Sequence, residues 1–294
     1  MAATFADLKN EVYGHCYGYS RDQEQVTYLA TAITSSDVSI SLGDATQVGK
    51  GVMEIDDELM WVLSKNHTAN TATVATSWGR GYLGSTAASH AQYARVTSNP
   101  RFPRLTISNT INELILGVYP MLYGIAQTTF TWNASVTTYA LPAAADRVLN
   151  IEWELPGPSN EWATVRRWRE LLSGDGGVNE VAIYDGIVPG RTVRVNYAKK
   201  PTALSADGDL LTGTGLAESA RDLIVYGSVA KLVMLSESGR LQSRAIESSE
   251  LNEDVPAGSA TTIGKRFFDL YQARLNEERN RLLQRFPPSI HLTR

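Results

Sequence analysis

The chain has 294 residues, of which 43% are hydrophobic and 20% charged, and its formal net charge at pH 7 is −4. This composition predicts a folded globular protein and excludes a disordered one. No apolar run approaches the roughly 18 residues that a membrane-spanning helix needs, so we expect no membrane contact. The first residues show neither a basic region nor an apolar core of the signal-peptide type, and we expect no signal peptide.

Few residues are suited to metal, cofactor or disulfide chemistry. Cys16 is the single cysteine, which excludes an internal disulfide and a cysteine-type zinc site, and it fits synthesis in a reducing cytoplasm. The four histidines are scattered along the chain: His15, His67, His90 and His291. The chain also lacks the common hydrolase and nucleotide-binding motifs. We therefore expect no metal, no cofactor and no enzymatic activity.

The first 33 residues are predicted to form two short helices. Phe5, Leu8 and Val12 recur at spacings of three and four residues, which gives one apolar helical face, and Thr4 can cap its start. A second short helix is predicted over 22–32 from its apolar positions. We assign residues 1–33 to the α-helical core of the protein.

Residues 34–99 have the pattern of a small antiparallel β barrel or curled sheet. Several short strands are predicted here, and some of them alternate apolar and polar side chains. Strands this short cannot cover two sheet faces, which favours a small closed module. Pro100 and Pro103 mark its end.

The densest carboxylate cluster in the first half of the chain falls between two of these strands. The strands are predicted over 51–55 and 58–63, with a hairpin turn at Asp56 and Asp57. We interpret Asp56, Asp57 and Glu58 as a solvated turn. Binding of a divalent ion or acid catalysis is the alternative interpretation of the cluster.

The segment WGRGYLGSTAASHA, over 78–91, contains three glycines with the spacing G-x-G-x-x-G: Gly79, Gly81 and Gly84. A dinucleotide-binding turn also needs a crossover helix, a second parallel strand and an acidic residue about 20 positions further on. The next acidic residue is Glu113 and the intervening helical stretch is too short, so we exclude nucleotide binding. His90 and Ser89 are neighbours that point apart, and we expect His90 to form hydrogen bonds inside this loop.

Between Glu58 and Glu113 the chain has no acidic residue. Five basic residues lie in this interval: Lys65, Arg80, Arg95, Arg101 and Arg104. They predict either a basic surface for DNA or an acidic partner, or simply strands with few charges. We favour the second interpretation, because the basic residues are spread out and lack interleaved aromatic residues.

Residues 100–126 are predicted to be a core helix, and 127–202 a second β module of the sandwich type. The helix carries a broad apolar stripe, and Pro120 is expected to disturb its last turn. The segment 149–155 alternates as a half-buried antiparallel strand does. Four tryptophans fall in the second module: Trp132, Trp153, Trp162 and Trp168. We interpret them as packing residues, with ligand stacking as the alternative.

Residues 203–286 are predicted to be C-terminal core helices, over 217–236 and 260–285. The first is apolar nearly all round and the second is amphipathic. Two prolines then end the helix, and 287–294 form an extended C-terminal arm. The arm is either a disordered end or a segment that docks on another subunit. Its candidate docking residues are Phe286, Pro287, Pro288, Ile290 and Leu292.

Taken in chain order, these elements indicate an α+β protein. N-terminal, central and C-terminal helices are expected to form an α-helical core that carries two inserted antiparallel β modules, a small barrel and then a sandwich.

The motif residues of the first module resemble a β module of tailed-phage structural proteins. Its consensus reads G-x-h-x-I-D-D-E-h-h and then R-G-x-x-G-T-T-A-A-x-H-A-x-G-A-x-V. This chain matches the two parts over 51–60 and 80–96, with Ser85 in place of a threonine and Tyr93 in place of a glycine. The motif residues, carried over as structural, are Asp56, Asp57, Glu58, Arg80, Gly81, Gly84, Thr86 and His90.

The order of the remaining segments resembles the head-to-tail adaptor, or neck, proteins of tailed phages. An F-x-x-L-x-x-x-V helix, I-N-E at 111–113, a Tyr-x-Leu-Pro stretch at 139–142 and a D-x-h-h-Y-G-x-x-A-x-L helix at 222–232 follow in that order. The resemblance implies a twelve-fold ring of this chain beneath the portal protein, with the C-terminal region docked into the portal. It also implies contact with a downstream neck, stopper or tail protein, and phage DNA that passes through the lumen without specific binding.

We therefore expect a structural virion protein, made in the host cytoplasm and placed in the neck between portal and tail. One alternative is another tail or baseplate structural protein. A second is a virion surface module that binds carbohydrate, and a third is an enzyme such as a tail hydrolase.

Overall fold

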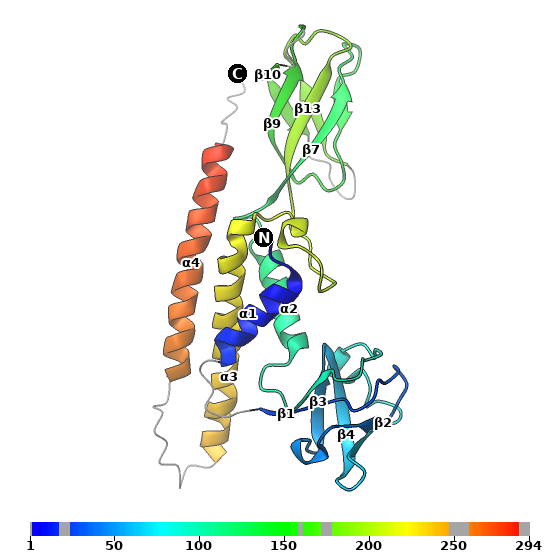
Figure 1. Ribbon diagram of the computed structural model, residues 1–294. Coiled ribbons are helices and arrows are strands. Elements are labelled where there is room, and N and C mark those ends of the chain that lie inside the picture. The colour runs from blue at the N-terminus through cyan, green and yellow to red at the C-terminus, as the bar shows by residue number, and fades with distance from the viewer. Residues whose placement is uncertain (1, 18–23, 158–160, 172–177, 247–258, 288–294) are drawn as a thin grey trace. The chain divides into compact units, whose positions relative to one another are not determined.

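The computed structural model describes residues 2–17, 24–157, 161–171, 178–246 and 259–287 (Figure 1). The chain divides into two compact units, which we describe separately. Unit 1 comprises Met1–Ala6, Asn112–Ile224 and Phe268–Arg294, and unit 2 comprises Asp7–Ile111 and Val225–Phe267. The α-helices of the described residues are α1 Phe5–Tyr17, α2 Arg104–Gly117, α3 Arg221–Ile246 and α4 Ser259–Arg285. The protein is of the α+β class, but each helix contributes residues to both units, so the α-helical core that the sequence predicts is only partly present.

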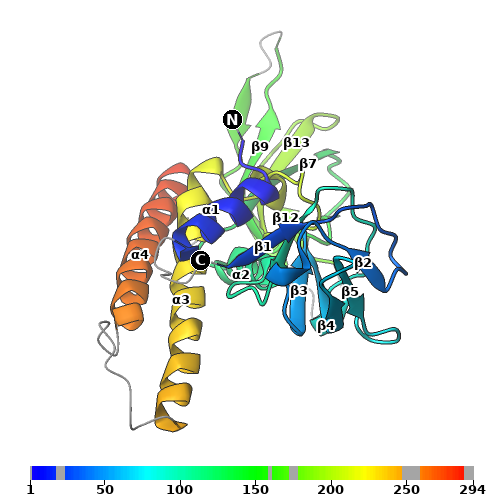
Figure 2. The same ribbon diagram turned by 60° about the horizontal axis from the view of Figure 1, so that its bottom comes forward.

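Unit 2 contains a six-stranded antiparallel sheet in the order β1-β6-β3-β4-β5-β2. Its strands are β1 Gln25–Tyr28, β2 Ser39–Ser41, β3 Gly51–Ile55, β4 Glu58–Asn66, β5 Thr71–Val74 and β6 Arg95–Ser98. Figure 2 shows β3, β4 and β5 side by side. Just beyond β1 and β2, a bridge between Leu29 and Leu42 joins the two ends of the sheet, so the strands curl into a small barrel around one apolar core.

The helix predicted over 22–32 is wrong for the part that the structure describes, which begins at residue 24. β1 pairs with β6, and its side chains alternate, with Thr27 buried between the exposed Val26 and Tyr28. β-branched and aromatic residues favour a strand. The partner strand lies about 70 residues further along the chain, and no local pattern reveals it.

The predicted hairpin is confirmed. β3 and β4 pair from Ile55–Glu58 outward, and Asp56 and Asp57 form the turn between them. Asp56 has a φ of +52°, in the left-handed region. Aspartate tolerates that conformation better than most residues, because its short polar side chain can hydrogen-bond locally.

Unit 1 contains two antiparallel sheets, in the orders β10-β9-β13-β7 and β11-β12-β8. The strands of the first are β7 Gly124–Thr131, β9 Arg147–Glu154, β10 Trp162–Thr164 and β13 Thr192–Lys199. Those of the second are β8 Thr138–Ala140, β11 Trp168–Leu171 and β12 Glu180–Ile183. Ile151 and Val193 from the first sheet share one core with Val181 and Ile183 from the second. The predicted sandwich is therefore present.

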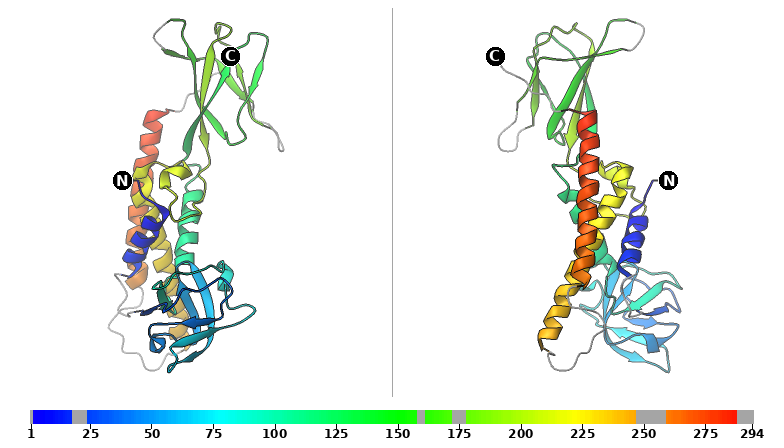
Figure 3. Two further views of the ribbon diagram at one scale, coloured as in Figure 1. Left: turned by 45° about the vertical axis from the view of Figure 1, so that its right-hand side comes forward. Right: turned by 90° about the vertical axis from the view of Figure 1, so that its left-hand side faces the viewer.

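α4 matches its predicted range of 260–285, whereas α2 is shorter than the predicted 100–126 and α3 ends at Ile246 and not at 236. α2 ends at Gly117, before Pro120, as expected of a residue that cannot continue a helix. α4, orange to red in Figure 3, is one continuous helix. Within unit 1 it is joined to the start of α3 by an ion pair of 2.7 Å between Arg274 and Asp222. Within unit 2, Gly264 allows close packing against Met234, because a Cβ atom there would lie 2.9 Å from the Met234 Cγ.

None of the helices in the described part of the chain is both long and apolar enough to cross a membrane.

We predict that Ile151→Ala lowers the free energy of unfolding of the sandwich by about 2 to 5 kcal/mol, because the truncation leaves a cavity in a fully buried site. Urea unfolding followed by tryptophan fluorescence measures the change. Val188→Ala, at an exposed position of the same module, is the control and should stay within about 0.5 kcal/mol. Equal effects of the two substitutions would contradict the assignment of the core.

Candidate functional site

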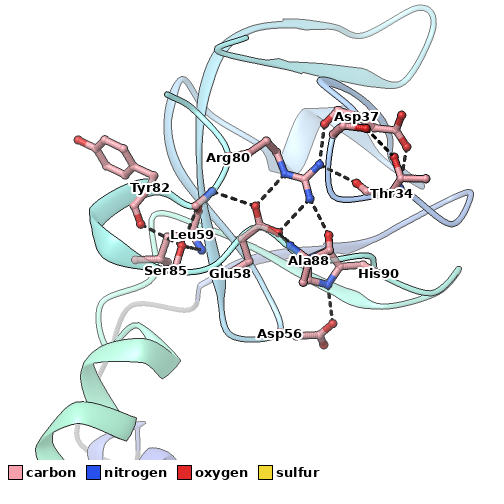
Figure 4. A network of polar contacts seen from close by, with 12 residues as sticks. Thr34, Asp37, Asp56, Glu58, Leu59, Arg80, Tyr82, Ser85, Ala88 and His90 are labelled. Atoms are coloured by element: carbon pink, nitrogen blue, oxygen red, sulfur yellow. Dashed lines mark hydrogen bonds and ion pairs between the residues drawn. The ribbon is translucent and has the colours of Figure 1, made fainter. Parts of the chain in front are cut away.

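A largely buried network of charged side chains joins β4 of the barrel in unit 2 to the neighbouring loops (Figure 4). Its centre is the pair formed by Glu58, the first residue of β4, and Arg80 from the loop between β5 and β6. Both side chains are buried. The Arg80 Nε lies 2.7 Å from Glu58 Oε1 and the Nη2 lies 2.9 Å from Oε2. This two-point geometry is the strongest form of an arginine–carboxylate pair.

The Glu58 carboxylate accepts three further hydrogen bonds. The backbone amide of Gly81 donates to Oε1 at 3.0 Å, and the amide of Ala88 donates to Oε2 at 2.9 Å. The His90 Nε2 lies 2.9 Å from Oε2. One carboxylate thus holds three points of the 80–90 loop in place.

Arg80 uses its remaining N–H groups on backbone carbonyls. Nη1 donates to the oxygens of Thr34 and Asp37, at 2.8 and 2.7 Å, and Nη2 donates to that of Ala88 at 2.7 Å. With the two bonds to Glu58, all five N–H groups of the guanidinium are used. Arg80 therefore ties the loop at 34–37 to its own loop and to β4.

His90 lies between two carboxylates. Its Nδ1 is 2.8 Å from Asp56 Oδ2, and its Nε2 faces Glu58. Because both ring nitrogens face acceptors, the ring is held in its doubly protonated form, which donates from both. The two cations, Arg80 and His90, balance the two anions, Glu58 and Asp56.

The pKa values follow from this geometry. Burial opposes the charged form of His90, but the hydrogen bonds and charges of Asp56 and Glu58 outweigh burial and raise the pKa of His90 to about 9. Burial also opposes the charge on Glu58, yet hydrogen bonds from Arg80, His90 and the two amides lower its pKa to about 2. Both groups are therefore charged at neutral pH.

The interpretation of Asp56, Asp57 and Glu58 as a solvated turn is wrong for Glu58, whereas the Asp56 and Asp57 side chains are 63% and 46% exposed. Glu58 is buried in the network, Asp56 binds His90, and Asp57 accepts a bond of 2.6 Å from the buried Nζ of Lys9 on α1. The His90 ring forms hydrogen bonds as expected, but its partners Asp56 and Glu58 lie in the β3–β4 turn and on β4 and not inside its own loop. The pairing of the cluster with Arg80 was missed, because the partners come from a later loop.

The other motif residues serve the backbone of the loop. Gly81 adopts a left-handed φ of +61°, where a Cβ atom would lie 2.9 Å from the carbonyl oxygen of Ser85. Gly84 also has a positive φ. Thr86 is exposed, and its neighbour Ser85 instead binds β4, where its hydroxyl accepts from the amide of Leu59 at 3.0 Å. The Gly81 amide, which a phosphate would need, donates to Glu58.

A second group of polar contacts fixes the barrel to α1 and α2 within unit 2. The Glu54 carboxylate on β3 accepts a hydrogen bond from the backbone amide of Arg104, at the start of α2. Tyr13 on α1 donates to Glu24 at 2.9 Å. Burial raises the pKa of Glu54 to about 7, although Arg104 opposes the shift. With Lys9 and Asp57, these contacts join both helices to the same end of the barrel.

Three of the five basic residues between Glu58 and Glu113 contact other residues of unit 2. Arg80 is buried in the network, Arg95 donates to Tyr13 at 3.1 Å, and Arg104 donates to Asn10 at 3.3 Å. The Arg95 side chain is nevertheless 55% exposed, so only Arg80 is removed from the surface, and both interpretations of this interval stay predictions.

The tryptophans of the sandwich are mainly packing residues. Trp132 is buried in its core, and Trp153 and Trp168 pack against that core. Trp162 lies outside the core, with the Arg194 guanidinium 4.1 Å from its ring centre. The packing interpretation is confirmed for three of the four.

Two remaining predictions concern the C-terminus and metals. Phe286 and Pro287 follow the end of α4, whereas Pro288, Ile290 and Leu292 lie outside the described residues. Docking by this arm stays a prediction. In the described part of the chain, no group of three or more histidine, cysteine or acidic side chains is placed to hold a metal ion.

We predict that the stability gained from His90 depends on pH. Because folding raises its pKa from 6.5 to about 9, the protonated ring stabilises the fold below pH 6.5 and this contribution is lost as the pH rises through 9. The difference in unfolding free energy between the wild type and His90→Gln should shrink by about 2 to 3 kcal/mol between pH 6 and pH 9.5. Urea unfolding followed by circular dichroism measures it, and a constant difference would contradict the charged ring.

We also predict that Arg80→Lys destabilises the barrel by about 3 kcal/mol, because an ammonium group cannot replace five N–H donors in a fixed planar array. Thermal unfolding measures the loss. Arg95→Lys, at a half-exposed position of the same module, is the matched control and should change stability by no more than about 0.5 kcal/mol. Similar losses in both variants would argue against the geometric role of Arg80.

The family model for the SU10 adaptor protein matches residues 83–284, which is more than half of the chain and begins inside the loop of the network. No curated protein matches it. The chain therefore belongs to the SU10 adaptor protein family and is a structural adaptor protein of the phage virion.

Proposed function

We propose that this chain is a non-enzymatic subunit of a ring that joins the portal to the tail and surrounds the DNA passage. The observation that carries the proposal is the complete internal use of its charged cluster. Glu58 accepts five hydrogen bonds and Arg80 donates five, all within the module. Groups used in this way hold a loop in place and have no free atom for a substrate, which suits a structural part of a family of adaptors.

The charge of the chain supports passage of DNA without a firm grip. The net charge is −4, and Arg80, Arg95 and Arg104 contact other residues of unit 2. Affinity for DNA comes mainly from lysine and arginine side chains that neutralise phosphates. A subunit that keeps these side chains occupied lets DNA slide, and the resemblance to neck proteins makes twelve the expected number of subunits.

The end of the chain is the proposed contact with the portal. In unit 1, α4 is fixed to the residues around the start of α3 by Arg274 with Asp222 and by Ser219, which donates to Glu278 at 2.8 Å. The same helix exposes Leu270 and Leu283. A firmly held helix with exposed apolar side chains is suited to present the following residues, from Phe286 onward, to a partner.

The carbohydrate-binding alternative has little support. It would use several exposed tryptophans on the sandwich, but Trp132, Trp153 and Trp168 belong to the core or pack against it. Trp162 lies outside the core beside Arg194, and Tyr184 is exposed on its own. The remaining alternative is that the chain is another structural protein of the tail or baseplate. The next experiment distinguishes this location from the neck.

The test combines the purified chain with the portal protein of the same phage. We expect electron microscopy of the mixture to show a ring on the tail side of the portal, and native mass spectrometry to give twelve copies. A chain that ends at Phe286 should fold with an unchanged circular dichroism spectrum and lose attachment, because it lacks the arm.

Tyr184→Ser serves as the control variant in this experiment. Tyr184 is an exposed side chain of the sandwich, and its replacement should leave attachment unchanged. A full-length chain that stays monomeric in the presence of the portal would refute the proposed function. Attachment that survives truncation would refute the role of the arm alone.

A further inference from the structure

Two side chains in the loop between β5 and β6 combine strain with exposure. Leu83 and Tyr93 are 67% and 70% exposed, more than any other large hydrophobic residue among those described. Both have a left-handed backbone, with φ values of +53° and +68°. This conformation costs roughly 1 to 2 kcal/mol in a residue other than glycine. A loop that served the fold alone would be more stable with glycine at both positions, which indicates that the side chains have a use outside the fold.

Leu83 directly follows Tyr82, a member of an aromatic cluster at the start of the loop, and we call this cluster together with Leu83 the first patch. It consists of Trp61 on β4, Trp78, Tyr82 and Leu83. The ring centres of Trp61 lie 5.9 Å from Trp78 and 5.2 Å from Tyr82. Trp78 is 51% exposed. The rings support one another and present an apolar surface to the outside of the barrel.

Tyr93 belongs to a second patch at the end of the loop. It pairs with Tyr28 on β1 at a distance of 6.0 Å between ring centres, and Tyr28 is 48% exposed. Val26, on the same face of β1, is also exposed. No member of either patch is charged, so like-charge repulsion does not oppose contact between them.

The two patches lie on opposite sides of the barrel. In the strand order β1-β6-β3-β4-β5-β2, β1 and β4 are three positions apart in a sheet of six strands that closes through Leu29 and Leu42. The first patch lies on β4 and the second on β1.

The buried network holds the loop that carries both patches. Arg80 fixes the loop between Trp78 and Tyr82. Near the other end, the amide of His90 donates to the Ile33 carbonyl at 3.0 Å and that of Tyr93 donates to Leu29 at 2.9 Å. Groups held in place before binding lose little entropy when they bind.

We propose that the first patch of one subunit contacts the second patch of the next copy of this chain. Identical subunits form a ring only through two different, complementary surfaces, and surfaces on opposite sides of one module meet this requirement. The inference rests on the proposed ring and names the residues of one of its lateral contacts.

The area of the patches indicates whether this contact alone can hold two subunits together. A fully buried aromatic side chain covers about 150 to 250 Å², so four partly exposed residues offer roughly 300 to 400 Å². A stable complex buries about 800 Å² on each partner. The contact is too small to hold two free subunits, and it adds to the assembly of subunits that the portal has already aligned.

The test replaces each strained residue by glycine. Leu83→Gly and Tyr93→Gly relieve the left-handed backbone, so the melting temperature should stay the same or rise. Each variant should nevertheless need at least tenfold more protein to fill the portal by half, measured by sedimentation of the portal complex. The double variant should lose little more than either single variant, because both residues belong to one contact. Tyr184→Ser is again the control. Unchanged half-filling in both single variants, or fully additive losses, would overturn the inference.

A second measurement needs no portal, because a disulfide traps even a short-lived contact. An equimolar mixture of a Leu83→Cys chain and a Tyr93→Cys chain, oxidised mildly at high concentration, should give several times more cross-linked dimer than either variant alone. Equal yields of dimer from the mixture and from the separate variants would overturn the proposed contact. If the wild type fails to bind the portal while the mixed dimers form, the proposed function fails and the contact between copies stands.

Discussion

The pairing of Glu58 with Arg80 is the interaction on which the barrel depends. Taking two such charges out of water carries a penalty of several kcal/mol for each ion, and their mutual attraction offsets it only if the remaining hydrogen bonds are satisfied. In this barrel all of these hydrogen bonds are formed. Arg80 donates from its five N–H groups, and the Glu58 carboxylate accepts from the arginine, His90 and two amides. The consequence is geometric, because β4, the 34–37 loop and the 80–90 loop can take only one arrangement relative to one another.

The same constraint extends from the barrel to the helices of unit 2 through the β3–β4 turn. Asp56 binds His90 on one side of the turn, and Asp57 binds the buried Lys9 of α1 on the other. One residue before the turn, Ile55 is buried in the barrel core, and Glu54 beside it accepts the first amide of α2. The two-residue turn thus connects the network with α1, which precedes the barrel in the chain. β3, the strand before the turn, holds the start of α2, which follows the barrel.

Sequence periodicity predicted the elements whose pattern is local. The β3–β4 hairpin and α4 lie close to their predicted ranges, and α2 and α3 form where predicted but with other ends, because an apolar stripe or an alternating strand is visible within a dozen residues while its ends are not. β1 was mistaken for a helix, since Thr27 is buried by a strand far along the chain. The network was missed for the same reason, as Glu58 meets Arg80 and His90 only after 22 and 32 residues. A possible signal was present: Glu58 is the last acidic residue before Glu113, and Arg80 needs a counter-charge.

A loop fixed at so many points can tolerate local strain that would otherwise rearrange it. Residues in sparsely populated backbone conformations persist only where the surrounding structure determines their position. Leu83 lies three residues after Arg80, and Tyr93 lies three residues after His90, so each strained residue is close to an anchor of the network. The buried charges therefore do more than stabilise a barrel. They allow two apolar side chains to stand exposed in a defined orientation, which a flexible loop could not do without losing entropy at every contact it made.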